Sequence, residues 1–193
     1  REYFYDPTDA RLAGLEIQCL DDVPPPAPPT DARLAKRLRD ATRFVRDTTQ
    51  MVPLPAAMLP ENGFMDPFPF PANMRGWGLP DNVYAFGRFE LADDEVMEIR
   101  AEVTDCAYWG IQTWNFFMQS LDWQHHRVSL NQRQLGLDGP GDARVVLTPG
   151  PADRPGWFGT AGYRTGMIFC RWLLSDRMPA KPVVTVRQRA ELA

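Results

Sequence analysis

Apolar and charged side chains alternate along residues 96–103, from Val96 to Val103. In an extended chain this spacing places the apolar side chains on one face and the charged ones on the other, so it predicts a half-buried β-strand. A second run rich in aromatic and apolar residues covers 83–91, and the polar segment 91–95 separates the two. The pattern predicts that they pair as an antiparallel hairpin.

Similar short runs follow through the second half of the chain. They predict strands at 108–117, 127–131, 143–148, 166–174 and 183–187. Many short strands joined by turns, without alternating strands and helices, are typical of a mainly β fold. The fold class predicted is therefore an antiparallel, jelly-roll-like β-sandwich.

The first half of the chain has a different pattern. Residues 15–20 alternate and predict a strand, and residues 23–29 then hold five prolines, which predict a semi-rigid extended arm. Thr30 and Asp31 are typical of a helix start, and an amphipathic helix is predicted over 30–47. Its apolar stripe consists of Leu34, Leu38, Ala41 and Val45.

Residues 51–80 are irregular and rich in proline, yet they carry many apolar side chains. Such a loop is expected to wrap the core or to cover a pocket. The chain is therefore expected to divide into two regions. Residues 1–82 would hold the N-terminal strand, the proline-rich arm, the helix and this loop, all packing on the core, and residues 83–193 would form the β-sandwich.

Composition narrows the function classes. The 193 residues are 44% hydrophobic and carry 25 acidic against 21 basic side chains, a net charge of -4 that disfavours nucleic acid as a partner. The apolar runs fall short of the roughly 20 residues of a membrane span, so a soluble protein is expected. Cys19, Cys106 and Cys170 fit neither a disulfide framework nor a zinc site, which favours reduced thiols, a cytoplasmic location and no metal or cofactor.

Common catalytic motifs are missing from the sequence: it has no phosphate-binding loop, no nucleophile elbow and no zinc-protease helix. The two histidines, His125 and His126, are adjacent, and on a strand they would point to opposite faces instead of sharing a metal ion. Either could act as an acid or base with Asp122 as its orienting group. An exposed polar pair is the simpler interpretation.

The aromatic segment 108–117 mixes rings with amides and hydroxyls. On a strand Gln112 and Trp114 share one face, and Thr113 and Asn115 share the other. Buried amides need hydrogen-bond partners, so the pattern predicts either a hydrogen-bonded core strand or the wall of a ligand pocket. The candidate ligand-binding residues are Trp109, Gln112, Trp114, Asn115, Trp123, Asn131, Trp157 and Arg171.

Arg171 stands out because it lies within an otherwise apolar run. A buried guanidinium needs a carboxylate or several acceptors to offset its desolvation. Two interpretations stay open: an ion pair with Asp105 or Glu102 that fixes the sheet, or an anchor for an anionic ligand.

Several motifs together resemble a bacterial family. They are Tyr3-Phe4-Tyr5-Asp6, Trp109 with Ser-Leu-Asp-Trp at 120–123, Ser-Leu-Asn at 129–131, Gly-Trp-Phe-Gly-Thr-Ala-Gly at 156–162 and Arg-Trp-Leu at 171–173. Over essentially its whole length the sequence is similar to the domain of unknown function 1214 family in its actinobacterial form, although Gly156, Gly159 and Tyr163 depart from the family's late motif. The resemblance implies a jelly-roll-like sandwich, and this chain would be the C-terminal portion of a longer protein, as its start at Arg1 also suggests. It implies no established reaction.

The sequence favours a ligand-binding or accessory domain whose aromatic groove takes an apolar or sugar-like molecule. One alternative is a metal-independent hydrolase or lyase that uses His125 or His126 with Asp122. Another is a structural domain whose arm and helix pack on a partner subunit, such as a second copy of the chain, or on a preceding N-terminal region.

Overall fold

The structure is a computed structural model that describes residues 18, 28–51, 58–69 and 81–192. The chain divides into two units, residues 1–41 and 42–193. The predicted strand at 15–20 and the proline-rich arm lie almost entirely outside the described residues. No helix in the described part of the chain is long and apolar enough to span a membrane.

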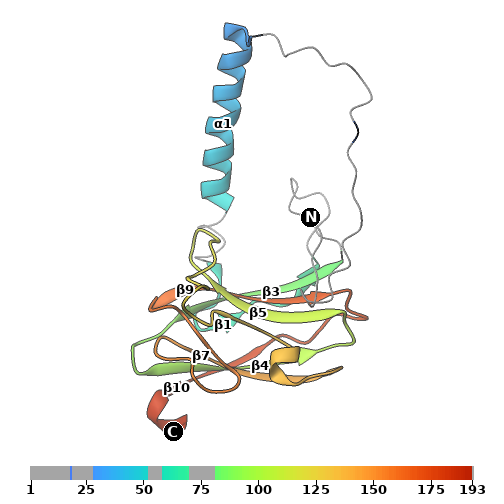
Figure 1. The fold of residues 1–193 in the computed structure, drawn as a ribbon, viewed down its shortest axis with the longest axis vertical. Helices are drawn as coiled ribbons and strands as arrows, with labels where there is room; N and C mark the ends of the chain where they lie inside the picture. The colour runs from blue at the N-terminus through green and yellow to red at the C-terminus, as the bar shows by residue number, and fades with distance from the viewer. Residues whose placement is uncertain (1–17, 19–27, 52–57, 70–80, 193) are drawn as a thin grey trace. The chain divides into compact units, whose positions relative to one another are not determined.

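The predicted helix is present as α1, Asp31–Met51 (Figure 1). Its first turn is capped as the sequence suggests, because the Arg33 amide donates to Thr30 Oγ1 at 3.3 Å. An ion pair of 2.6 Å joins Lys36 to Asp40, one turn apart on its surface. The side chains of Leu34 and Leu38, in its apolar stripe, are exposed.

The second unit contains a β-sandwich of two packed sheets, which confirms the predicted fold class (Figure 1). The six-stranded sheet has the order β1 (Gly63–Phe64), β3 (Asn82–Glu90), β9 (Thr165–Leu173), β5 (Tyr108–Trp114) and β6 (Ser129–Asn131), and β2 (Phe68–Pro69) also pairs with β3. The four-stranded sheet has the order β10 (Val183–Gln188), β4 (Glu95–Val103), β7 (Gly141–Thr148) and β8 (Trp157–Gly159). All strand pairs are antiparallel except β7 with β8. Two short 3-10 helices, η2 (Arg133–Leu135) and η3 (Arg189–Leu192), follow β6 and β10.

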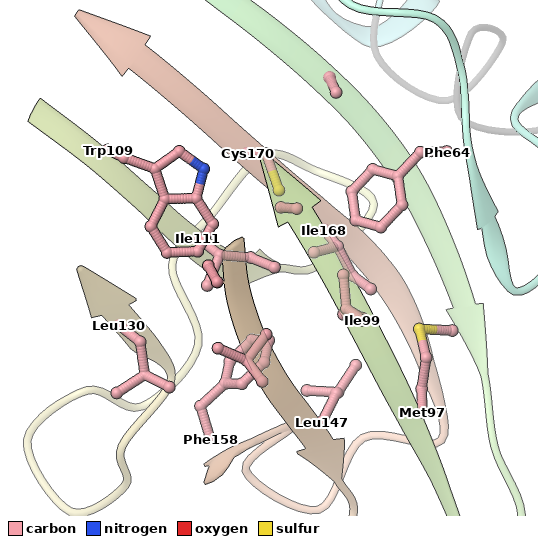
Figure 2. Close-up of a cluster of buried hydrophobic side chains, with 14 of the residues drawn as sticks. Phe64, Met97, Ile99, Trp109, Ile111, Leu130, Leu147, Phe158, Ile168 and Cys170 are labelled. Carbon is pink, nitrogen blue, oxygen red and sulfur yellow. The ribbon is translucent and has the colours of Figure 1, made fainter. Parts of the chain in front are cut away.

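The hydrophobic core lies between the two sheets (Figure 2). Trp109, Ile168 and Trp172 from the six-stranded sheet are fully buried, as are Leu147 and Phe158 from the other sheet. Alternate residues of each long strand supply these side chains, because successive residues point to opposite faces of a sheet. The apolar face that the alternation in 96–103 predicts is therefore the inner face of β4.

The predicted hairpin between 83–91 and 96–103 is wrong. Both strands form, but β3 pairs with β9 along its whole length, and β4 lies in the other sheet between β10 and β7. The turn after Glu90 thus carries the chain from one sheet to the other. Both strands still turn an apolar face to the shared core, so the alternation alone could not distinguish the two arrangements.

Two further differences concern short strands. The glycine-bracketed segment around Trp157, predicted as a turn, forms β8. Part of the irregular region 51–80 adds to the six-stranded sheet, because β1 and β2 both pair with β3. Residues 52–57 and 70–80 of that region lie outside the described residues.

Candidate functional site

The outer face of the six-stranded sheet, turned away from the core, carries an unusual set of side chains. The register of β3, β9 and β5 places them in three cross-strand rows: Tyr84, Arg171 and Gly110; Phe86, Phe169 and Gln112; Arg88, Met167 and Trp114. Directly opposed residues on neighbouring strands have Cβ atoms about 4.5–5.5 Å apart, so the side chains within a row are in contact range. The aromatic rings are thereby gathered on one surface.

A groove with a volume of about 230 Å³ lies on this face. We call it the outer groove. Its lining consists of Tyr84, Phe86, Tyr108, Gly110, Ile111, Gln112, Trp114, Met118, Ser129, Phe169 and Arg171. The residues come from β3, β5, β6 and β9 and from the loop after β5, so the groove depends on the topology of the sheet.

Aromatic rings form one wall of the outer groove. The ring centroids of Trp114 and Phe169 are 4.4 Å apart, and those of Phe86 and Phe169 are 4.5 Å apart with an interplanar angle of 67°. Phe68 packs edge-on against Phe86 at 5.2 Å. Such edge-to-face and tilted contacts are favourable for aromatic pairs. The rings of Phe86, Phe169 and Trp114 belong to a cluster that is separate from the sandwich core.

Polar groups lie beside this wall. Gln112 Nε2 donates to Ser120 Oγ at 3.0 Å, which fixes the amide next to Trp114. Ser129 faces the groove from β6 and is exposed. Gly110 leaves space on the sheet surface, and the Tyr108 phenol lies over it, where a Cβ on residue 110 would overlap the ring.

Arg171 is exposed at the end of the groove that Tyr84 also lines. Its guanidinium carbon lies 5.1 Å from the centre of the Tyr84 ring, a cation–π contact. Burial raises the pKa of Tyr84, and the charge of Arg171 partly opposes that rise.

The predicted ion pair of Arg171 with Asp105 or Glu102 does not form. Glu102 instead binds Arg177 at 2.5 Å and accepts a hydrogen bond from the Ala180 amide, which holds the pKa of that carboxyl below its usual value. The ion pair was predicted for a buried guanidinium. Because Arg171 occupies an outer-face position of β9, water solvates it and no carboxylate is required.

The other predicted ligand-binding residues lie elsewhere. Trp109 is fully buried in the core because it has the opposite parity to Trp114 on β5. Trp157 is buried on the other sheet, where the guanidinium groups of Arg154 and Arg189 lie 4.9 and 5.1 Å from its ring. Trp123 is 68% exposed in a loop.

The two predicted asparagines serve their own turns. Asn115 Oδ1 accepts hydrogen bonds from the amides of Phe117 and Gln119. Asn131 Oδ1 accepts one from the Gln134 amide at 3.1 Å. Neither asparagine lines the outer groove, so of the eight candidates the structure places Gln112, Trp114 and Arg171 there.

The predicted acid–base pair is formed, but away from the groove. His125 Nδ1 lies 2.8 Å from Asp122 Oδ2, and this hydrogen bond lowers the pKa of Asp122. Both side chains and that of His126 are exposed in the loop that precedes β6. They do not line the outer groove, and the catalytic alternative stays a prediction.

Sequence reasoning missed the residues that complete the groove, chiefly Tyr84, Phe86 and Phe169. The signal was present, because β3 and β9 are apolar at both odd and even positions and so offer an apolar surface on both faces. Only the strand order brings these positions next to Trp114.

Comparisons with known proteins place the fold. Neither family models nor curated proteins give a match. The chain is similar to the crystal structure of an uncharacterised protein from Burkholderia cenocepacia, with 28% identity and a TM-score of 0.74 over 86% of this chain. The match covers 47% of that protein, so this chain spans about half its length. The VPA0106 protein from Vibrio parahaemolyticus is less similar, with 16% identity, a TM-score of 0.45, and coverage of 61% of this chain and 34% of that one.

Proposed function

We propose that the domain binds a small molecule with a flat apolar or sugar-like face in the outer groove. The observation that carries the proposal is the wall formed by Phe86, Phe169 and Trp114 on the outer surface of a sheet that already has a core on its other side. Ligand sites are typically apolar and aromatic concavities with a few placed polar groups. Gln112 and Ser129 supply such groups for ring substituents or hydroxyls.

The size of the groove favours a small ligand. Pockets for drug-sized molecules occupy about 300–1,000 Å³, and an engineered apolar cavity of about 150 Å³ holds benzene. The outer groove, at about 230 Å³, lies between these values. A molecule of one or two rings therefore fits best.

A hydrogen-bond donor without a partner also supports ligand binding in the outer groove. The indole Nε1 of Trp114 is buried and has no hydrogen-bond acceptor among the described residues. A buried donor without a partner costs about 1–3 kcal/mol. A ligand oxygen placed beside the ring would accept this hydrogen bond, which adds a polar contact to the stacking surface.

The test uses two neutral probes, 2-naphthamide for the apolar class and methyl β-glucopyranoside for the sugar-like class, titrated by calorimetry. The wild type is expected to bind one of them, and Trp114→Ala is expected to weaken that binding about tenfold or more, the loss of about 1.4 kcal/mol of stacking and hydrogen bonding. Trp123→Ala removes an exposed indole in a loop and serves as the control. The proposal fails if the wild type binds neither these probes nor their carboxylate counterparts, or if Trp123→Ala weakens binding as much as Trp114→Ala.

A further inference from the structure

The charge in the outer groove is carried by one side chain. Arg171 is the sole ionisable residue with a full charge at neutral pH among the eleven that line it, and no carboxylate lies within ion-pair distance of it in the described part of the chain. The groove is therefore locally positive on a chain whose net charge is -4. Charges beyond about 8–10 Å are largely screened at physiological salt, so a ligand inside the groove would respond mainly to Arg171.

A second arginine on the same face does have carboxylate partners, in contrast to Arg171. Arg88 lies one strand away on β3, and the described residues supply it with two carboxylates, Glu90 at 2.6 Å and Glu61 at 3.3 Å. The described residues thus neutralise the guanidinium outside the groove, and none of them supplies a counter-ion to the one inside it.

The surroundings of Arg171 also orient its guanidinium. The cation–π contact with Tyr84 holds it from the β3 side. Its cross-strand neighbour on the β5 side is Gly110, which has no side chain to pair with it. A planar guanidinium held in this way presents a fork of N–H donors that matches the two oxygens of a carboxylate.

We propose that the ligand of the outer groove is a small ring compound that carries a carboxylate, with the carboxylate on Arg171 and the ring on Phe169 and Trp114. This inference rests on the proposed function and names its ligand class. Residues two apart on one strand are about 7 Å apart on the same face, so Arg171 and Phe169 are separated by one such step. That spacing fits an acid group attached to the ring directly or through a short link, as in an aromatic acid or a uronic acid.

The test compares neutral and anionic probes of matched shape. The pairs are 2-naphthamide with 2-naphthoate, and methyl β-glucopyranoside with methyl β-glucuronide, titrated by calorimetry near neutral pH. The wild type is expected to bind the acid of one pair about tenfold or more tightly than its neutral partner, because a hydrogen-bonded charge pair is worth about 1.5–3 kcal/mol. The preference should weaken as salt is added.

Variants assign that preference to one side chain. Arg171→Gln is expected to bring the ratio of the two affinities close to one, and Arg171→Lys, which keeps the charge without the fork, to give an intermediate ratio. Arg88→Gln is the matched control and should keep the wild-type ratio. Thermal unfolding of each variant checks that the fold is intact, as is expected for the Arg171 variants because that side chain is exposed.

Each outcome decides between the two proposals. If the neutral probe binds in a Trp114-dependent way but the wild type shows no preference for the acid, the ligand class is wrong and the binding groove stands. If the preference survives Arg171→Gln, the role given to Arg171 is wrong. If no probe of either pair binds, both proposals fall.

Discussion

The two faces of the six-stranded sheet are both apolar, yet they are apolar for different reasons. Along β9, Ile168, Cys170 and Trp172 point inward and have no exposed surface. Phe169, from the alternate set, points outward and is almost as well buried at 7% exposed, although no second sheet of the described residues covers that side. The inner set belongs to the core between the two sheets, whereas Phe169 belongs to a second, separate cluster with Met167, Phe86 and Trp114.

The outer face of the four-stranded sheet shows what an ordinary solvated face looks like in this domain. There Glu98 binds Arg187 and Glu102 binds Arg177, each at 2.5 Å and each on the surface. A sheet face that is exposed to solvent is typically polar and carries such charged pairs. An aromatic surface in the corresponding position on the partner sheet is therefore typical of a binding site.

The largest expected effect separates two tryptophans on opposite faces. Trp172→Ala removes a fully buried indole that also donates to the Glu102 carbonyl, so it should lower the free energy of unfolding by about 3–5 kcal/mol. Trp114→Ala, on the outer face, should cost about 1–2 kcal/mol because its side chain is only partly buried. Urea unfolding measures both. Equal losses would contradict the distinction between the two faces.

A matched pair of glycines tests the same distinction by adding one methyl group. At Gly87 a Cβ would overlap the Gly63 carbonyl oxygen and press on the Phe64 ring, so Gly87→Ala should destabilise the fold by about 1–3 kcal/mol. At Gly110 it would meet only the end of the Tyr108 side chain, which can swing away. Gly110→Ala should therefore change the melting temperature far less, and a larger loss there than at Gly87 would overturn this reading.

Two adjacent polar residues on β5 give a smaller contrast. The Thr113 hydroxyl is buried within reach of the Val128 and Gly159 carbonyls, at 3.1 and 3.2 Å, so Thr113→Val should cost about 1–3 kcal/mol. Gln112 bonds Ser120 at the surface, and Gln112→Ala should stay within about 0.5 kcal/mol. Chemical denaturation of both variants checks the order, which would be reversed if β5 were turned the other way.

A further effect appears only at alkaline pH. Burial raises the pKa of the Cys170 thiol far above its ordinary value. Stability from the neutral thiol is complete below the unfolded pKa of about 8.5 and is lost as pH rises past it, because only the unfolded chain then ionises. Between about pH 7.5 and pH 9.5 the wild type should therefore lose about 1.4 kcal/mol relative to Cys170→Ala. Parallel pH profiles for the two proteins would show that the thiol is not buried.

The sequence predicts where the strands lie better than it predicts which strands pair with each other. Alternation in β4 and apolar runs elsewhere located β3, β4, β7, β9 and β10 to within two residues, whereas β5 ends at Trp114, three residues before the predicted end at 117. The pattern could not tell that β3 pairs with a strand about 80 residues later, since a local pattern specifies a face and not a partner. Strands β1, β2, β6 and β8 carry too few residues to show a period.

The candidate site was predicted in part for the same reason. Parity placed Gln112 with Trp114, and a charge inside an apolar run drew attention to Arg171. The same parity already separated Trp109 from Trp114, so both could not line one groove. Phe86 and Phe169 lie in apolar runs of the sequence, and only the strand order shows that they face outward.

Proton–nitrogen correlation NMR of the tryptophan indoles, during titration with the naphthyl and glucosyl probes, tests the central claim most directly. Trp114→Phe assigns the Trp114 signal, and Trp172→Phe assigns a core signal for comparison. The account predicts that a bound probe shifts the Trp114 indole resonance and leaves that of Trp172 unchanged, because the probe occupies the outer face. Binding that shifts Trp172 and spares Trp114, or no shift with any probe, would contradict it.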